Sequence, residues 1–425
     1  MARLALFGLQ AALLTGCVFN TAGVAPSPVD TGDVTVPLDL DDAATAEAAQ
    51  HDLGDGPAPD GPPDRDPDAL PVDTGTPDVG LVCTDWSSKP KHFEPCQIPL
   101  PAGKLDLATA GTWTYDTTAG TLVDPNKATI TPPSVVLSQS GGPQIRVVSV
   151  TRLSVQKGVT LRVVGDRPLV VAAWTDISVD GTVDVGSDSK DGAGADPSDC
   201  ASHAAKDGST DHNEGGGGGG GGFGGDGGDG GDGRSGSANG GAKGAKIAPP
   251  TVVRGGCEGG RGGDSGGSGG SGGGALQLSA RLAITVAGTL HAGGERGAGA
   301  GTGDKGGGGG GSGGYLGLDA PSVTLESTAI LAANGGGGGE GSSGLSGKSG
   351  EHGLAQAQAA DGGSGGTSSG GDGGDGGWRD GPNGQNGKQD SDGGGGGGGG
   401  VGFVLVHGKL DNQGATTSPN TTAGP

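Results

Sequence analysis

The stretch Asn213 to Gly233, NEGGGGGGGGFGGDGGDGGDG, restricts what this chain can fold into more than any other segment. Glycine has no side chain to bury, and it loses more backbone freedom on folding than any other residue. The chain contains 104 Gly and 26 Pro among 425 residues, while aromatic residues make up only 3%. A large conventional core is therefore not expected, and any core has to be built from small aliphatic residues.

Alternating apolar residues predict short β-strands from about Ile145 onward. The segment 169–186 aligns without a gap with 276–293, at a constant offset of 107 residues. A third copy spans 316–334, with one extra residue before Val323. A degenerate earlier copy spans 153–163, and a truncated last copy spans 403–410.

Repeats of this kind predict the fold class. A unit with one apolar face cannot bury it alone, but stacked units form a continuous core. About five short turns of an all-β, parallel β-solenoid (a β-helix) over 145–413 fit best. The alternative is an antiparallel sandwich with a tight hairpin turn at Asp180-Gly181.

Three glycine-rich segments, 187–274, 295–313 and 336–400, each follow the same point of a repeat. In a solenoid, insertions at equivalent points leave from one edge. Runs such as 224–232 and 370–378 have a period of three, with two Gly and one other residue. A left-handed extended helix has three residues per turn and no internal hydrogen bonds, so its amides must bond to water or to neighbouring strands.

These triplet runs resemble the polyglycine II helices of some antifreeze and phage adhesin proteins. The glycine content also resembles the glycine-rich half of the PE-PGRS family, whose N-terminal helical domain this chain lacks. The resemblance implies polyglycine II-like insertions that lie side by side with every third residue outward. Disordered insertions are the alternative.

The N-terminus has the features of an export signal. Arg3 precedes a short apolar run, and the run ends in Leu14-Thr15-Gly16-Cys17. This motif resembles the lipobox of bacterial lipoproteins, which implies cleavage before Cys17 and a diacylglycerol group on its thiol, with palmitate among the acyl chains. Val18 follows, where Asp would imply retention in the inner membrane. We therefore expect a signal peptide over 1–17 and a lipid anchor in the outer membrane, at the cell surface or the periplasmic face.

Residues 18–80 are expected to form a disordered acidic linker that holds the rest of the chain away from the membrane. Between Asp30 and Asp78 it has thirteen Asp and one Glu against a single Arg. Together with the overall charge of −23, this argues against nucleic acid as a partner. A disulfide-closed cap over 81–144 and a disordered tail over 414–425 complete the expected organisation.

Export to an oxidising compartment makes disulfides the expected state of the other cysteines. Four cysteines allow three pairings, and closeness in sequence favours Cys83–Cys96 and Cys200–Cys257. A zinc site is the alternative, with ligands drawn from the following set: Asp199, Cys200, His203, Asp211, His212, Glu214 and Cys257. Their spacing fits no common zinc pattern.

Two stretches fit the first six positions of the calcium-binding nonapeptide G-G-x-G-x-D-x-U-x, namely Gly224 to Asp229 and Gly370 to Asp375. The apolar U position is Gly in both, so the strand of a calcium roll is missing. Low-affinity calcium binding is the resulting expectation, with these candidate ligands: Asp226, Asp229, Asp232, Asp372 and Asp375.

Asp176, Asp180 and Asp184 are expected on the face opposite the apolar residues. Acidic rows of this kind are found in solenoid enzymes that act on polysaccharides, but the later copies lack the acids. The favoured function is therefore a non-enzymatic, surface-displayed lipoprotein without a cofactor, with a structural or adhesive role in the cell envelope. Glycans or other envelope components are the expected partners, a polysaccharide lyase or glycosidase is the alternative, and self-association stays open.

Overall fold

The computed structural model describes residues 82–86, 89–188, 191–234, 237–366 and 370–425. All of them belong to one compact unit, Thr76–Pro425. Cys17 and the segment 18–80, which is expected to be an acidic linker, lie outside the described residues. No helix in the described ranges has the length and apolar character needed to cross a bilayer.

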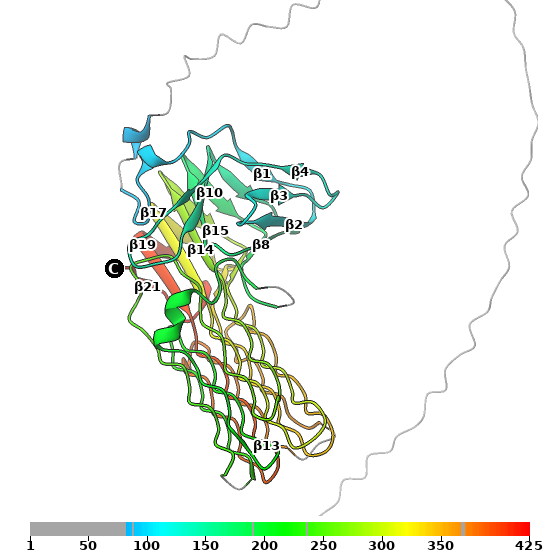
Figure 1. The fold of residues 1–425 in the computed structure, drawn as a ribbon. Helices are drawn as coiled ribbons and strands as arrows, with labels where there is room; N and C mark the ends of the chain where they lie inside the picture. Colours follow the sequence, from blue (N-terminus) through cyan, green and yellow to red (C-terminus); the bar gives the residue numbers. More distant parts are fainter. Residues whose placement is uncertain (1–81, 87–88, 189–190, 235–236, 367–369) are drawn as a thin grey trace, which may run out of the picture. The chain divides into compact units, whose positions relative to one another are not determined.

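The described chain is all-β, with mostly parallel strand pairing (Figure 1). Its largest sheet curls and consists of β1 (Leu105–Leu107), β5 (Ser134–Leu137), β6 (Ile145–Val150), β7 (Leu153–Val155), β9 (Leu169–Ala173), β10 (Asp176–Val179), β14 (Ala275–Ala280), β15 (Ala283–Val286), β17 (Tyr315–Leu325), β19 (Phe403–Asn412) and β21 (Thr422–Ala423).

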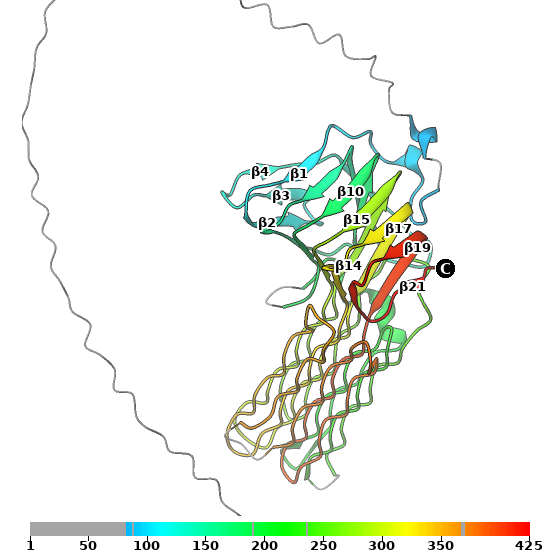
Figure 2. The ribbon, with the colours of Figure 1, turned by 180° about the vertical axis from the view of Figure 1, so that it is seen from behind.

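A second sheet lies beside it, as Figure 2 shows from behind. Its strands are β2 (Gly111–Asp116), β3 (Thr121–Val123), β4 (Thr129–Ile130), β8 (Val159–Val164), β11 (Thr182–Asp184), β16 (Thr289–His291), β18 (Ile330–Ala332) and β20 (Thr416–Ser418). The remaining described elements are the pair β12 (Thr210–Asp211) and β13 (Glu214–Gly215), and the 3₁₀ helices η1 (Cys83–Asp85), η2 (Pro95–Gln97) and η3 (Ser198–Ser202).

The strand register follows the sequence repeat. Leu169 pairs with Leu276, Ile177 with Ile284, and Thr182 with Thr289, each in parallel at the offset of 107. These parallel pairs contradict the antiparallel sandwich. Alternating side chains of the stacked strands fill a continuous core of Val, Leu, Ile and Ala, because successive side chains of a strand point to opposite faces.

The third copy differs from expectation at one corner. Val323 pairs with Ile284, at an offset of 39, whereas Leu316 pairs with Leu276 at 40. The corner after Ala320 is therefore one residue shorter than in the second copy, and the prediction of an extra residue there was wrong. β17 runs through this corner as one strand of 11 residues.

The C-terminal segment was also predicted incorrectly. Thr416–Ser418 forms β20, which pairs with β18, and Thr422–Ala423 forms β21, which pairs with β19. The last copy is thus not truncated at 410, and the segment 414–425 contains paired strands. Its Thr-rich composition lacks an apolar alternation, but the neighbouring strands supply hydrogen-bond partners for its backbone.

The three glycine-rich insertions leave from equivalent points. Each begins after a strand of the second sheet and returns to a strand of the first. At the return points the amides of Gly274, Gly314 and Gly402 donate to carbonyl oxygens at the departure points. The bonds are Gly274 to Val185 at 2.9 Å, Gly314 to Ala292 at 2.7 Å and Gly402 to Ala333 at 2.7 Å.

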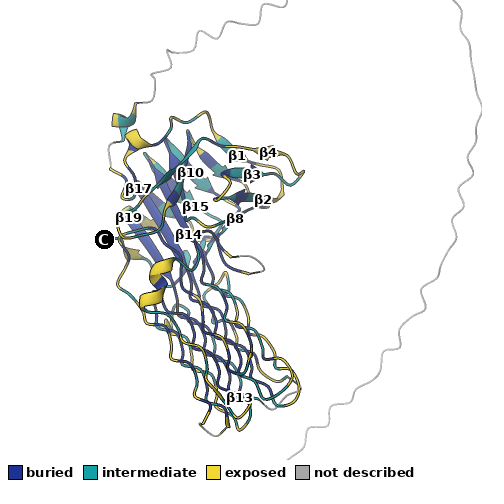
Figure 3. Ribbon diagram, in the orientation of Figure 1, coloured by how far each residue is buried: buried dark blue, intermediate teal, exposed yellow. Residues whose placement is uncertain are grey.

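These insertions form a hydrogen-bonded body that we call the glycine bundle, comprising the described residues of 203–273, 293–313 and 335–402. Figures 1 and 2 show its segments running side by side away from the sheets. Four uninterrupted glycine segments, 215–222, 306–311, 335–339 and 393–400, are buried throughout. Figure 3 shows buried residues along both the sheet strands and the bundle segments.

The segment 215–222 illustrates how the bundle is bonded. The amides of Gly216, Gly217 and Gly218 donate to three different segments, and Gly219, Gly220 and Gly221 donate to the same three in turn. Their carbonyls accept from three further segments. The six neighbours are 206–209, 228–231, 241–244, 260–263, 307–310 and 394–400.

Glycine is required in these interior segments. A Cβ added to Gly217, Gly218 or Gly219 would overlap a backbone carbonyl oxygen of three different neighbours, those of Gly395, Gly260 and Ala242. Every face of the segment is therefore in backbone-to-backbone contact. Segments with two Gly and one other residue lie around this interior, because they have one face that can carry a side chain.

Candidate functional site: a polar groove beside the Cys83–Cys96 loop

Both predicted disulfides are confirmed. Cys83 and Cys96 are joined, with Cα atoms 4.9 Å apart, and Cys200 and Cys257 are joined, with Cα atoms 5.6 Å apart. The first closes the segment 83–96 into a loop, which we call the disulfide loop. The second ties η3 to the base of the glycine bundle.

The disulfide loop covers the outer face of β9, β14, β17 and β19, and this position was not predicted. Trp86 of the loop packs edge-on against Trp174, with ring centroids 6.0 Å apart, and Phe93 belongs to the same apolar cluster. The cover is needed because β9 is buried on both faces. Val170 and Ala172 point away from the core of the stack and would otherwise meet water.

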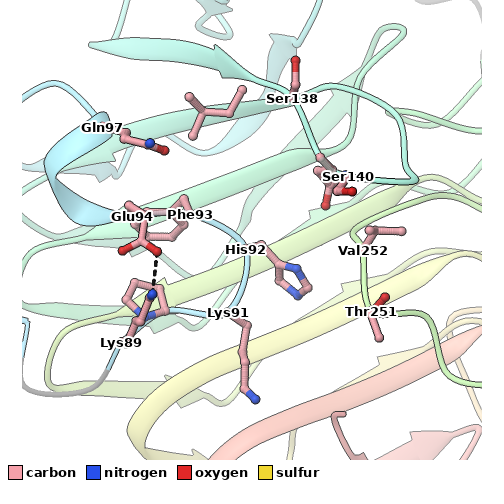
Figure 4. Close-up of a pocket in the computed structure, with 13 residues that line it drawn as sticks. Lys89, Lys91, His92, Phe93, Glu94, Gln97, Ser138, Ser140, Thr251 and Val252 are labelled. Carbon is pink, nitrogen blue, oxygen red and sulfur yellow. Dashed lines mark ion pairs between the residues drawn. The ribbon is translucent and has the colours of Figure 1, made fainter.

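A groove lies along one side of this loop (Figure 4). It has a volume of about 710 Å³, within the range of small-molecule sites. Three stretches of chain contribute its walls: the disulfide loop with Gln97 directly after it, the end of β5 with the connection to β6, and residues 251–252. The lining residues are Lys89, Pro90, Lys91, His92, Phe93, Glu94, Gln97, Leu137, Ser138, Gln139, Ser140, Thr251 and Val252.

Backbone and side-chain hydrogen bonds hold these walls. The Lys91 amide donates to Asp319 Oδ2 at 2.9 Å, which fixes the loop to β17. Gln139 Nε2 donates to the Val253 carbonyl oxygen at 2.8 Å, and the Val253 amide donates back to Gln139 Oε1 at 2.8 Å. Two walls from distant parts of the sequence are thereby joined.

The charged side chains that line the groove are mostly paired with other groups at its rim. Lys89 Nζ lies 2.6 Å from Glu94 Oε1, and both side chains are largely exposed, so the pair adds little stability. Lys91 Nζ donates to the carbonyl oxygen of Pro425 at 3.1 Å. The groove thus presents hydroxyl, amide and amino groups, which suits a hydrophilic ligand.

His92 of the disulfide loop packs edge-on against the rings of Tyr315 and His407. Its Nε2 is 3.4 Å from the Tyr315 hydroxyl, which donates to Gln277 Oε1 at 3.1 Å. Burial, followed by the charges of His407 and Lys91, lowers the pKa of His92 to about 4. Burial also raises the pKa of Asp319, against the bond from the Lys91 amide and the Lys91 charge.

We therefore predict that His92 makes the protein less stable in acid. An unfolded His has a pKa near 6.5. The stability that the folded protein has with a neutral His92 is therefore fully present above pH 6.5 and is lost as pH falls toward 4. The free energy of unfolding should drop by about 3 kcal/mol over that interval. In His92→Gln the drop should be smaller, as measured by chemical denaturation at pH 7 and pH 4.

His212→Gln is the matched control, because the His212 side chain is 70% exposed at the far end of the bundle. It should keep the acid sensitivity of the parent. The raised pKa of Asp319 has the opposite effect on the free energy of unfolding in acid. This effect is common to the parent and both variants, so it cancels when they are compared. An unchanged pH dependence in His92→Gln would contradict the assignment.

The zinc candidates are not brought together as one set. Among the described residues, Cys200, His203 and Cys257 form the one group of three potential ligands close together. The two sulfurs are bonded to each other, and the Arg254 guanidinium donates to both, at 3.1 and 3.3 Å. Asp211 and Glu214 lie instead in β12 and β13, at the far end of the bundle (Figure 1).

The calcium candidates have other partners. The carboxylates of Asp226, Asp229 and Asp232 accept amide hydrogens from a neighbouring segment, at 2.8, 3.0 and 2.7 Å. Asp375 accepts from the Gly362 amide at 2.9 Å, and Asp372 pairs with Lys388 at 2.7 Å. Four of these carboxylates accept bonds from backbone amides and the fifth is held in an ion pair, which favours a structural role.

The acids at 176, 180 and 184 do not form one row. Asp176 lies on β10, Asp180 at the corner after it, and Asp184 on β11. Asp184 lies between Arg162 at 3.1 Å and His291 at 2.9 Å. Burial alone would raise the pKa of Asp184, but its bonds and charge interactions with His291 and Arg162 and the bond from the Gly186 amide lower it.

The groove residues escaped sequence analysis because nothing in their spacing marks a site. The usable signal was the unbroken apolar run 169–174, which is typical of a strand covered on both faces. Such a strand requires a covering segment, and the disulfide loop carries Trp86 and Phe93. No protein-family model, curated protein or solved structure matches this chain.

Proposed function

We propose that this chain is a non-enzymatic lipoprotein displayed at the outer membrane, with a structural or adhesive role in the cell envelope. The observation that carries the proposal is the glycine bundle. Its interior segments each hydrogen-bond to six neighbouring segments, so these residues form a stiff body and not a flexible linker. A stiff projection on an acidic tether suits contact with other surfaces better than catalysis.

We further infer that the stacked strands are the turns of a parallel β-solenoid. The constant offset of 107 between paired residues supports this, as does the departure of all three insertions from equivalent points. The bundle segments are inferred to be polyglycine II helices. In support, their bonds run only to other segments and the partners recur every third residue, the period of that helix.

The dimensions of the bundle fit a display role. The segment 305–314 runs between the far end and the sheets, and ten residues at about 3.1 Å each extend about 30 Å. Segments from all three insertions lie side by side over this length. The groove beside the disulfide loop would then supply a hydrophilic contact site for a glycan or another envelope component.

The alternative is a polysaccharide lyase or glycosidase, for which Asp184 is the best-positioned carboxyl. A glycosidase uses paired carboxyls, one of which gives up a proton. The partners of Asp184 lower its pKa and occupy its oxygens, which favours a structural carboxylate. Low-affinity calcium binding remains a weaker alternative, since the bundle carboxylates already accept hydrogen bonds.

Anchoring is tested by Cys17→Ala. Without the acceptor thiol, the protein should leave the membrane fraction and appear in the soluble periplasm, or accumulate as unprocessed precursor. Fractionation and palmitate labelling measure both outcomes. Cys83→Ala is the matched control, because it removes a cysteine without touching the lipobox. Palmitate retained on the Cys17→Ala protein would contradict lipidation at this residue.

A further inference from the structure

A row of threonines follows the outer face of the second sheet. Thr160 pairs with Thr112 on one side and with Thr182 on the other. Thr182 pairs in turn with Thr289. Their neighbours Leu161, Val183 and Leu290 belong to the core, so the threonines point outward. In register, the full row is Thr112, Thr160, Thr182, Thr289, Ile330 and Thr416.

The hydroxyls of this row are free to bind. Within the described part of the chain, no hydrogen bond occupies the hydroxyl of Thr160, Thr182 or Thr289, and all three residues are partly exposed. Adjacent parallel strands lie about 4.8 Å apart, so a hydroxyl repeats at about that interval over the four strands β2, β8, β11 and β16. Ile330 on β18 interrupts the row before Thr416. Strand pairing fixes their positions before any ligand arrives, which lowers the entropy cost of binding.

A hollow opens over one end of the row. It has a volume of about 380 Å³, and its lining residues are Thr112, Thr114, Thr160, Arg162, Val164, Asp184 and Asp188. The Arg162 guanidinium lies 3.1 Å from Asp184 and 3.0 Å from Asp188, so each charged side chain at the hollow is in an ion pair. Such paired, immobilised polar groups suit a ligand that is polar but uncharged.

His291 holds the floor of the hollow in place. Its Nδ1 is 2.9 Å from Asp184 Oδ1, and its Nε2 is 2.8 Å from the Gly353 carbonyl oxygen. The imidazole ring therefore joins β11 to the third glycine-rich insertion and keeps the Asp184 carboxylate fixed.

We propose that this face, which we call the threonine row, binds a neutral polysaccharide. A linear polymer of hydroxylated rings presents the repeated donors and acceptors that match the row, and one sugar residue fits the hollow. An anionic polysaccharide is disfavoured by the net charge of −23. The inference goes beyond the proposed function and does not depend on where the protein resides.

The test compares two triple variants of the full-length chain. Thr160→Val, Thr182→Val and Thr289→Val together remove three hydroxyls from the row while keeping strand-forming side chains. The control is Ser154→Ala, Thr285→Val and Thr324→Val, which removes three hydroxyls in register on the adjacent outer face of β7, β15 and β17. Equal thermal midpoints verify that both variants fold.

Binding is measured by affinity electrophoresis with a soluble β-glucan and a galactomannan, and by depletion onto chitin, with alginate as the anionic comparison. We expect the parent and the control to bind at least one neutral polymer, and the threonine-row variant to bind it at least about tenfold more weakly. Equal binding by both variants, binding of alginate alone, or no binding by the parent would overturn the inference. Adhesion of whole cells by the full chain would still stand in each of those cases.

Discussion

Replacing Gly227 and Gly230 with Ala should destabilise the glycine bundle by about 3 kcal/mol or more. A Cβ on Gly227 would overlap the Gly220 carbonyl oxygen, and one on Gly230 would overlap that of Gly217. Forcing extra atoms into a close-packed site costs about 1–3 kcal/mol even where side chains can adjust. Here the obstacle is backbone bonded on its other faces, which has little room to move.

Gly301→Ala is the matched control, since it adds the same methyl group within the same bundle. A Cβ there would meet no atom within 4 Å, and Ala also restricts the unfolded chain. Its stability should equal or slightly exceed that of the parent in differential scanning calorimetry. Near-ultraviolet circular dichroism from buried Trp174 should be unchanged in all variants, because the substitutions do not alter the packing of the two large sheets. Similar melting of all variants would mean that the glycines are not close-packed.

Removing the Cys200–Cys257 disulfide should cost about 4 kcal/mol. The bond closes a loop with a sequence separation of 57, and the loop-entropy estimate rises with loop length. It also lies at the base of the bundle, where the Cys257 amide donates to Ser312 Oγ at 2.8 Å. In Cys200→Ser with Cys257→Ser, the bundle should therefore loosen first at this end.

The comparison is Cys83→Ser with Cys96→Ser, which opens a loop with a separation of only 13. Its expected cost is about 3 kcal/mol, confined to the disulfide loop and the groove. Calorimetry gives the total loss for each variant, and limited proteolysis locates the loosened segment. If the Cys200–Cys257 variant melts like the parent, the bundle does not depend on this tie.

The two large sheets were largely predictable because the apolar side chains of their strands repeat visibly in the sequence. Apolar residues at Leu169, Ile177 and Val183 recur 107 positions later, and those are the residues that the register pairs. The departure points of the insertions followed from the same alignment. The corner near Val323 was misjudged because sequence alternation cannot tell a tighter turn from an added residue.

The groove and the threonine row were not predictable in the same way. Lys91 and Asp319 are 228 residues apart in sequence, and no periodicity connects them. The threonines are separated by glycine-rich insertions, so their common row emerges only once the strands are paired. Spacing alone predicts calcium ligands in the triplet runs, because the sequence does not show the partners of these carboxylates, which are backbone amides and, for Asp372, the Lys388 amino group.

The most direct test of the central claim is amide hydrogen exchange over residues 215–222 in the unmodified protein. The amides and carbonyls of Gly216 to Gly221 bond to six neighbouring segments, so these amides should exchange far more slowly than in an unfolded chain. Slow exchange across this segment, comparable with that of β14, is the predicted result. Exchange at the rate of a random coil would mean that the bundle does not exist and that the glycine-rich insertions are spacers.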